Sequence, residues 1–161
     1  MKTAEEWIKE LNLEPHPEGG YYRQTDRSKE TYSREGKDFA LYTNIYFLLT
    51  PDSPSHFHQL TSDEMWFYHA GHPLTVHSLN PDGSYTKATL GLETAQTLHH
   101  TVPAGTIFGS TVEEGYALVS CTVVPGFDFA DFKMFTKKEL LEDFPKHQDI
   151  INQLAYETLP E

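Results

Sequence analysis

Residues 55–71 read SHFHQLTSDEMWFYHAG and hold two histidines one residue apart, then a carboxylate and a band of aromatic side chains that ends in glycine. In a β-strand, residues i and i+2 point to the same face. A strand here therefore aims His56 and His58 in one direction, and a hairpin through QLTS (residues 59–62) returns Glu64 beside them. Two imidazoles and a carboxylate suit Fe, Mn, Zn or Ni. The residues leave open a metal site or a metal-free pocket with an acid and two bases.

The rest of the chain consists mainly of short strand-like runs between Gly or Pro turns. Residues 40–49 (ALYTNIYFLL), 74–79 (LTVHSL) and 116–124 (YALVSCTVV) are rich in β-branched and aromatic residues, and turn sequences such as PDSP and NPDG separate the runs. Short strands at intervals of about 8–12 residues with turn signals predict an antiparallel sandwich or barrel. The predicted fold class is therefore mainly β.

Helical signals occur only at the two ends of the chain. Thr3 and Glu6 form a capping-box pattern before an apolar stripe, and Thr136 precedes KKELLEDF in the same way. No linker or repeat divides the sequence. We predict one domain over residues 1–161, with a helix in residues 1–14, a β-barrel in about 15–135 and helices in 136–156.

Composition narrows the range of partners. The chain carries 24 acidic and 12 basic residues, a formal charge of −12. Such a surface repels nucleic acid and anionic membranes, so we expect neither as a partner. Cys121 is the single cysteine and lies in an apolar run, so we expect a buried thiol. The sequence has no long apolar stretch or signal-peptide core, which predicts a cytoplasmic protein.

A second block strengthens the significance of the histidine stretch. Residues 102–109 (VPAGTIFG) place P-x-G about forty residues after Glu64. H-x-H, Glu, a glycine seven residues later and then P-x-G resemble the two cupin motifs, and PHPEGGYYRQT (15–25) and CTVVPGFDFADFKM (121–134) resemble the cupin-5 family. The resemblance implies a double-stranded β-helix, which is a small jelly-roll barrel and is usually dimeric. It implies no particular reaction.

Two positions depart from the cupin pattern. Five residues separate His58 from Glu64, where cupins usually have three or four; Asp63 fits the shorter interval, but Gly71 identifies Glu64 as the counterpart. The usual fourth metal ligand, three residues after the glycine of P-x-G, is replaced by Phe108, which cannot coordinate a metal. The expected metal ligands are therefore His56, His58 and Glu64, with water or substrate completing the site.

Further side chains are candidate ligand contacts. Arg23 can clamp a carboxylate or phosphate, and Trp66 and Tyr68 share a strand face with Glu64 and can stack a sugar or base. We expect Asn44 or Tyr46 to point into the barrel near the histidines. The candidate catalytic residues are His56, His58, Glu64 and Tyr46; the candidate ligand-binding residues are Arg23, Asn44, Trp66, Tyr68, His99 and Phe108; His16, His77 and His147 receive no role.

Two functions remain open from the sequence. The first is a small cupin that binds a sugar, keto acid or nucleotide-sugar-like molecule in the barrel mouth and isomerises or epimerises it. One divalent transition metal acts there as a Lewis acid, or His56 or His58 acts as the base. The second is a metal-free cupin that binds a small molecule without transforming it. In both, we expect a homodimer.

Overall fold

The computed structural model describes all 161 residues, and most of the regular structure is strand. The strands are β1 (Glu14–Pro15), β2 (Tyr21–Arg27), β3 (Thr31–Arg34), β4 (Lys37–Ala40), β5 (Thr43–Leu49), β6 (Ser55–Gln59), β7 (Asp63–Gly71), β8 (Leu74–Leu79), β9 (Tyr85–Leu90), β10 (His99–Val102), β11 (Ile107–Val112), β12 (Ala117–Val124) and β13 (Lys133–Met134). The helices are α1 (Ala4–Glu10), α2 (Lys137–Asp143) and α3 (Gln148–Leu154), with a 3₁₀ turn η1 (Phe129–Asp131).

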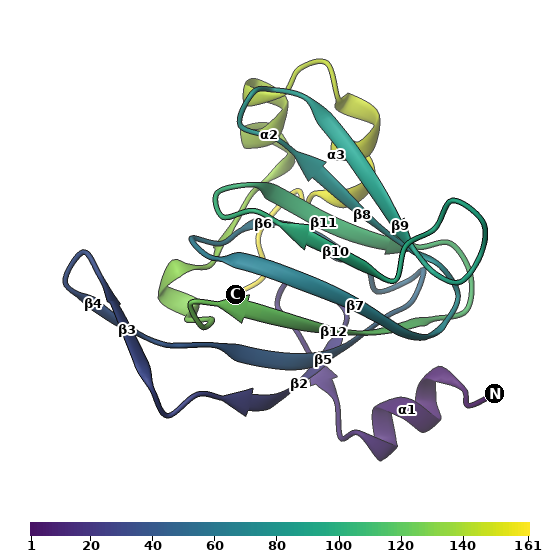
Figure 1. Cartoon of the computed structure of the whole chain (residues 1–161). Coiled ribbons are helices and arrows are strands. Elements are labelled where there is room, and N and C mark those ends of the chain that lie inside the picture. Colours follow the sequence, from purple (N-terminus) through teal and green to yellow (C-terminus); the bar gives the residue numbers. More distant parts are fainter.

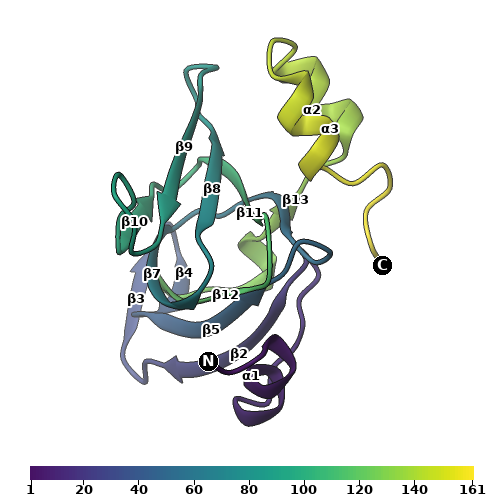
Figure 2. The same ribbon diagram turned by 90° about the vertical axis from the view of Figure 1, so that its right-hand side faces the viewer.

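Two antiparallel sheets face each other and form a barrel (Figure 1). One has the order β1-β2-β5-β12-β7-β10 and the other the order β13-β6-β11-β8-β9, while β3 and β4 form a separate hairpin that extends away from the barrel. Viewed after a quarter turn, the strands surround a central interior (Figure 2). Strands distant in sequence alternate within each sheet, which is the jelly-roll arrangement. The predicted mainly β, double-stranded β-helix fold is confirmed.

The core lies between the two sheets. Its largest fully buried side chains include Phe47, Trp66 and Phe108, which come from β5, β7 and β11. Alternate residues of each strand face this interior, as the pleat requires. The sheets therefore share one apolar core, and polar side chains that enter it are unusual enough to suggest a site.

The terminal helices cover the outer faces of the sheets. Thr3 and Thr136 each cap a helix through the predicted capping box. Helix α1 packs against the six-stranded sheet, and α2 and α3 bury Leu140, Ile151 and Leu154 on the outer face of the five-stranded sheet. No helix has both the length and the apolar character needed to cross a membrane.

The connection after β6 is a corner between sheets and not the hairpin expected from the sequence. Strand β6 pairs with β11 and β13, whereas β7 pairs with β12 and β10. At the far end of β7, Gly71 has a φ of +96°, and a Cβ there would lie 2.2 Å from the carbonyl oxygen of Tyr116. The glycine of the motif is therefore required by backbone packing.

Candidate functional site

A cavity of about 380 Å³ penetrates the barrel between the two sheets. Strands β2, β5, β6, β7 and β12 contribute to its wall, together with the segment before β2 and the segment after β12. The ionisable residues that line it are Glu14, His16, Glu18, Tyr22, Arg23, His58, Glu64 and Cys121. Several polar groups converge in an otherwise apolar interior, which is typical of a ligand site.

The segment before β2 folds against the barrel wall and inserts Glu18. The N–H of His56 donates to the carbonyl oxygen of Glu18 at 2.6 Å, and the N–H of Gly20 donates to Oγ of Ser53 at 2.9 Å. Gly19 has a φ of +105°, and a Cβ there would lie 1.8 Å from the carbonyl oxygen of Pro54. The paired glycines therefore permit the close approach of this segment to the residues before β6.

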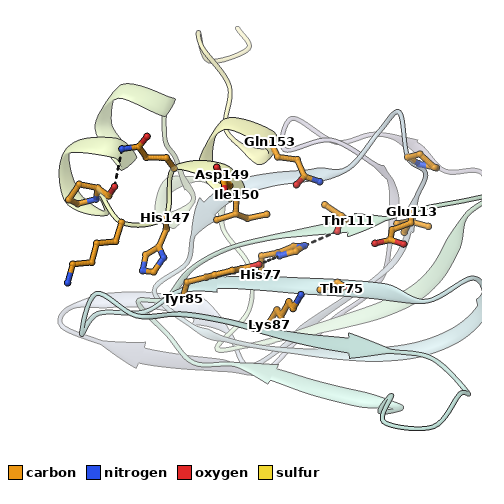
Figure 3. Close-up of a pocket in the computed structure, with 15 residues that line it drawn as sticks. Thr75, His77, Tyr85, Lys87, Thr111, Glu113, His147, Asp149, Ile150 and Gln153 are labelled. Carbon is orange, nitrogen blue, oxygen red and sulfur yellow. Dashed lines mark hydrogen bonds between the residues drawn. The ribbon is translucent and has the colours of Figure 1, made fainter.

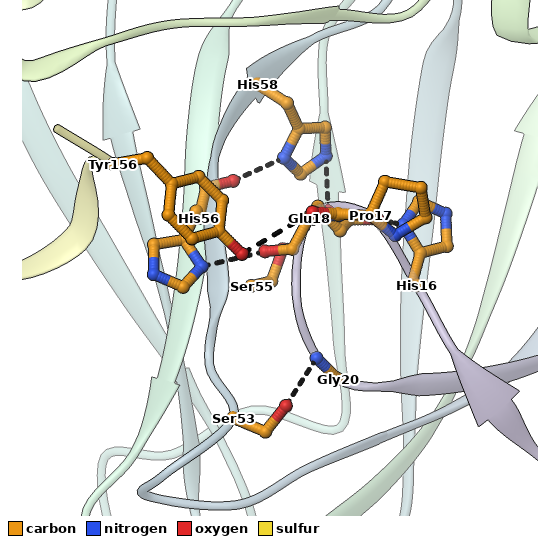
Figure 4. Close-up of polar contacts among 9 residues, drawn as sticks. All are labelled: His16, Pro17, Glu18, Gly20, Ser53, Ser55, His56, His58 and Tyr156. Carbon is orange, nitrogen blue, oxygen red and sulfur yellow. Dashed lines mark hydrogen bonds and ion pairs between the residues drawn. The ribbon is translucent and has the colours of Figure 1, made fainter. Parts of the chain in front are cut away.

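Glu18 and His58 form a buried ion pair (Figure 4). Nε2 of His58 lies 2.9 Å from Oε2 of Glu18, which also accepts a hydrogen bond from Oγ of Ser55 at 2.5 Å. Nδ1 of His58 lies 2.7 Å from the carbonyl oxygen of His56 and must donate to it, because a carbonyl can only accept. Both ring nitrogens therefore carry hydrogen, and His58 is an imidazolium.

The ionisation of this pair follows from its surroundings. Burial opposes the charged forms of both groups. The positive charge of His58 and hydrogen bonds from His58 and Ser55 nevertheless lower the pKa of Glu18 to about 2, while the charge and hydrogen bond of Glu18 raise the pKa of His58 above its usual value. The pair is thus charged at neutral pH.

A β-bulge explains why only one histidine of the H-x-H pair lines the cavity. Against β11, His58 pairs with Phe108 but Ser55 pairs with Ser110, so β6 contains one extra residue between Ser55 and His58. Ser55 and His58, three residues apart, consequently both reach Glu18. The prediction that both imidazoles enter the barrel mouth is wrong for His56.

His56 supports the segment that carries Glu18. Its Nδ1 lies 2.9 Å from the carbonyl oxygen of Glu18. Its ring stacks on Tyr156, with centroids 3.7 Å apart and planes at 15°, and the Tyr156 hydroxyl donates to the carbonyl oxygen of Pro17 at 3.4 Å (Figure 4). The chain after α3 therefore braces this segment from outside the cavity.

Glu64 lines the cavity and has one carboxyl oxygen without a hydrogen-bond partner. The residue is 7% exposed, and its Oε2 is buried with no hydrogen-bond partner. Burial and the negative charge of Glu18 raise the pKa of Glu64 to about 8, and a hydrogen bond links the carboxyl group to the Cys121 thiol. At neutral pH Glu64 is therefore largely protonated, and its Oε2 is a buried polar atom without a partner in the chain.

His16 is a second cavity residue with an unused polar atom. The N–H of Glu18 donates to Nδ1 of His16 at 3.1 Å, which places the ring hydrogen on Nε2. Nδ1 also lies 3.3 Å from Oε1 of Glu18, but a nitrogen that accepts cannot donate, so this approach is not an ion pair. Burial lowers the pKa of His16, which keeps the ring neutral. The Nε2–H group has no partner in the chain.

The sequence reasoning missed both His16 and Glu18 as site residues. Both lie in the block PHPEGGYYRQT (15–25), in which the sequence analysis assigns a role to Arg23 alone. The two residues share the i, i+2 spacing of His56 and His58, which is the one local signal that pointed to them. Their contact with β6 depends on the fold of the whole segment.

Two predictions on β5 are wrong about which strand face is internal. Thr43 and Ile45 line the cavity, whereas Asn44 and Tyr46 face outward. Asn44 hydrogen-bonds to the side chains of Thr25 and Thr122. Tyr46 packs in the cluster beneath α1, 6.1 Å from the ring of His69.

The predicted aromatic wall lies in the core and not along the cavity. Trp66 is fully buried between Phe47 and Phe108, so it shares the internal face with Glu64 as expected, but it is not among the lining residues. Phe108 packs 4.2 Å from the His58 ring. Of the remaining candidates, Tyr68 donates to the Gly71 carbonyl at 2.6 Å, and His99 lies exposed on β10. Arg23 is exposed at the cavity rim, but it pairs with Tyr46 across the strands, so its side chain shares the outer face of the sheet with Tyr46.

The expected metal ligands do not fit a metal in this arrangement. No group of three or more His, Cys, Asp or Glu side chains is placed to hold an ion. His58 uses both nitrogens as donors and has no lone pair to offer. His56 does not line the cavity, and Phe108 occupies the fourth position. Of the expected ligands that line the cavity, only Glu64 has an atom without a partner.

A larger groove of about 910 Å³ lies outside the barrel, between the five-stranded sheet and α3 (Figure 3). Its most buried polar residue, His77, has both ring nitrogens satisfied, by Tyr85 at 2.6 Å and Thr111 at 2.8 Å. Burial lowers the pKa of His77 to about 4, so the ring is neutral. Because these polar groups bind one another, the barrel cavity is the stronger candidate site.

Comparison with known proteins now places this geometry in a family. The family model described as "Cupin superfamily (DUF985)" matches residues 5–135. The chain belongs to this family. Among curated proteins, this DUF985 cupin is 32% identical over 149 residues to the uncharacterized protein YML079W of Saccharomyces cerevisiae, covering 80% of this chain and 73% of the yeast protein.

Solved structures give the same result. A hypothetical protein from Leishmania major has a TM-score of 0.90 and 46% identity, covering 96% of this chain and 99% of that one. Protein SO0799 from Shewanella oneidensis has a TM-score of 0.92 and 42% identity, covering 98% and 100%. Oxalate decarboxylase from Bacillus subtilis has a TM-score of 0.59 at 14% identity and covers 91% of this chain but 38% of its own. The last likeness is one of fold alone.

Proposed function

We propose that the barrel cavity binds a small polar or anionic metabolite and moves a proton at a carbon next to its carbonyl group, as an isomerase or epimerase does. The observation that carries this proposal is the pair of unused polar atoms in one cavity. Both residues line the cavity: Glu64 has a carboxyl group with one unpartnered oxygen, and His16 has an Nε2–H without a partner. An acid–base group and a hydrogen-bond donor are the two requirements of enolate chemistry.

The two groups have separate roles. In its ionised form, the Glu64 carboxylate takes the proton as the C–H bond breaks, and the electron pair moves to the carbonyl oxygen. The neutral His16 ring donates its Nε2–H to that oxygen and stabilises the enolate. Glu64 then returns the proton to the neighbouring carbon or oxygen, which gives the isomer.

His58 and Glu18 act through Glu64 and His16 in this scheme. His58 has no free nitrogen to meet a substrate, so we do not assign it the role of base. Glu18 fixes the tautomer of His16 through its own N–H. Its carboxylate also favours the protonated form of Glu64. The pair is therefore a positioning element.

Metal assistance has weaker support. One solved structure with this fold is Bacillus subtilis oxalate decarboxylase, which has Mn(II) centres and is 13% identical to this chain. A metal held by His56, His58 and Glu64 would require His58 to lose a proton and leave Glu18. Because the side chains do not fit an ion as placed, we route no step through one.

A binding role without chemistry is the second candidate. Phe127 and Phe129 line the mouth of the cavity, and aromatic walls suit retention of a ligand. A small molecule that raises the melting temperature and is recovered unchanged after long incubation supports this alternative.

Deuterium exchange tests the catalytic proposal. The protein is incubated in D₂O with a panel of keto acids and keto sugars, and NMR follows deuterium entering the carbon beside the carbonyl. We expect exchange above the spontaneous rate, reduced by about 10²-fold or more in Glu64→Gln. Glu114→Gln, an exposed acid outside the cavity, is the matched control. Exchange that persists in Glu64→Gln, or no exchange with any compound, overturns the proposal.

Expectations on partners stand beside this proposal. We propose a homodimer, supported by sheet edges at β9 and β10 that need cover. Light scattering with size exclusion tests it, and a monomer at high concentration contradicts it.

The charge of −12 supports the prediction that nucleic acid and anionic membranes are not partners. A cytoplasmic location stays a prediction.

A further inference from the structure

The mouth of the barrel cavity carries a carboxylate without a counterion. Glu14 on β1 lies directly opposite Tyr22 on β2, and Tyr22 lies directly opposite the core residue Phe47 on β5. Residues directly opposite each other share a sheet face, so Glu14 and Tyr22 are both on the face that lines the cavity. Burial and the negative charge of Glu14 raise the pKa of Tyr22, so the carboxylate lies close to that ring. Glu14 is exposed and belongs to none of the ion pairs of the chain.

No cation on the cavity face balances this carboxylate. Arg23 is on the outer face of the sheet, one residue out of phase with the cavity face. Inside the barrel, His58 is already paired with Glu18, and burial lowers the pKa of His16 and keeps its ring neutral. The mouth therefore holds an unbalanced negative charge, which attracts a positively charged group.

Aromatic rings form the rest of the mouth. Phe127 and Phe129, in the segment after β12, line the cavity together with Tyr22. The centroids of the Tyr22 and Phe129 rings lie 4.6 Å and 6.0 Å from that of His16. Phe129 is 52% exposed, which leaves part of its ring uncovered. The face of an aromatic ring is electron-rich and attracts an organic cation.

The surrounding structure holds the aromatic segment in place. The N–H of Phe127 donates to Oγ1 of Thr43 at 2.8 Å, and the Phe129 ring packs edge-on against Phe127 at 4.9 Å. Nζ of Lys37 lies 3.4 Å from Oδ2 of Asp128, so this lysine is itself paired. These contacts fix the exposed ring without burying it. Its position is therefore defined before a ligand binds.

We infer that the ligand of this cavity carries an organic ammonium group, held at the mouth between the Glu14 carboxylate and the rings of Tyr22 and Phe129. This inference deepens the proposed function and rests on it for the carbonyl group that meets His16 and Glu64. Among the polar metabolites that the function covers, it selects those with a positive charge, such as an amino sugar or an amino ketone. The cavity volume of about 380 Å³, near the lower end of the usual range for ligand sites, suits a molecule of that size.

Choline and its uncharged analogue are the probes. The analogue is the dimethylbutanol in which a carbon atom replaces the charged nitrogen, so the two molecules match in shape and differ in charge. Calorimetry measures the affinity of each for the wild type, Glu14→Gln and Phe129→Leu. Two control variants lie outside the cavity: Glu114→Gln removes the same charge from an exposed site, and Tyr32→Leu removes a ring that is 47% exposed on β3. Melting temperatures verify that each variant is folded.

We expect choline to bind about tenfold more tightly than the dimethylbutanol. Glu14→Gln should weaken choline about threefold to tenfold and change the dimethylbutanol by less than about twofold. Phe129→Leu should weaken choline more than the dimethylbutanol, and the two control variants should change neither by more than about twofold. Equal affinities for the two probes, no binding of choline, or equal losses in Glu14→Gln and Glu114→Gln overturn the inference.

Deuterium exchange separates this inference from the proposed function. Glucosamine and glucose differ by an ammonium group in place of a hydroxyl on the carbon beside the carbonyl, and we expect faster exchange in glucosamine. If choline is preferred but no carbonyl compound exchanges, the ammonium site stands and the proton transfer is wrong. If keto compounds exchange through Glu64 but choline binds no better than the dimethylbutanol, the proton transfer stands and the ammonium-bearing class is wrong.

Discussion

Nε2 of His58 lies 2.9 Å from Oε2 of Glu18, and the two side chains are only 3% and 8% exposed. Removing two charges from water is costly, and the attraction between them offsets that cost only when the remaining polar atoms are satisfied. Here Ser55 donates to Glu18, and the His56 carbonyl accepts from His58. The pair therefore persists because each member has a second partner.

Breaking this pair should be strongly destabilising. Glu18→Gln leaves the His58 charge buried without its counterion, and we expect the free energy of unfolding to fall by about 3–5 kcal/mol. Urea denaturation at neutral pH measures it. Glu157→Gln removes the partner of Lys137 in a surface pair where Glu157 is 80% exposed, and should cost less than about 1 kcal/mol. Equal effects of the two substitutions would contradict a special role for the buried pair.

The raised pKa of Glu64 predicts that stability falls as pH rises from about 4.5 to about 8. Its pKa is about 8 in the folded protein against 4.5 for the free group, so the unfolded chain releases the proton first as pH rises. The contribution of Glu64 is complete below about pH 4.5 and is lost as pH rises through 8. The loss amounts to a few kcal/mol.

Glu64→Gln removes this titration and gives the measurement. Unfolding free energies determined by urea from pH 5 to pH 9 should fall less steeply in Glu64→Gln than in the wild type. Groups away from the cavity titrate equally in both proteins, so the difference between the two curves reports Glu64 together with the groups coupled to it, His58 and Cys121. Parallel curves would show that Glu64 ionises normally in the fold.

Gly19 provides a test of how Glu18 is positioned. Gly19→Ala requires a Cβ 1.8 Å from the Pro54 carbonyl oxygen at a φ of +105°, whereas Gly36→Ala, at a φ of +78°, meets nothing within 4 Å. The left-handed backbone alone costs about 1–2 kcal/mol, which is the expected effect of Gly36→Ala. We expect a larger loss in Gly19→Ala, together with an altered His58 signal in NMR. Similar melting temperatures for both variants would contradict the close approach.

Metal binding can be tested by thermal denaturation. Because His58 has no free lone pair and His56 does not line the cavity, we expect chelator treatment to leave the melting temperature unchanged. Titration with Mn²⁺, Zn²⁺, Fe²⁺ or Ni²⁺ should not raise it either, since a ligand stabilises a fold only by binding it. Stoichiometric metal in the purified protein would show that His58 turns away from Glu18 when an ion is present.

The sequence predicted local features well and distant contacts poorly. The capping boxes at Thr3 and Thr136 formed as expected, because each involves residues three positions apart. The shared internal face of Glu64 and Trp66 was also predicted, since alternation is a local property of a strand. Alternation does not say which face is internal, however. Helix α1 covers the outer face of β5, so Tyr46 is partly buried on that outer face and not inside the barrel as predicted.

The prediction that both His56 and His58 line the cavity was wrong for a related reason. The bulge between Ser55 and His58 is defined by the register of β6 against β11, and that register belongs to a pair of strands and not to one strand. A regular strand assumed from the H-x-H spacing therefore brought His56 into the cavity. The replacement of a metal ligand by Phe108, in contrast, was visible in the sequence and agrees with the packing of that ring on His58.

By itself, the sequence determined the mainly β fold, the capped terminal helices and the family, because these depend on patterns within short segments and on spaced motifs. Only the tertiary structure decided that Glu18 meets His58 and that His16 and Glu64 keep free polar atoms in one cavity. The physical reason is that the ionisation and hydrogen bonding of a buried group depend on every neighbour that replaces water. Those neighbours come from segments that approach one another only after folding.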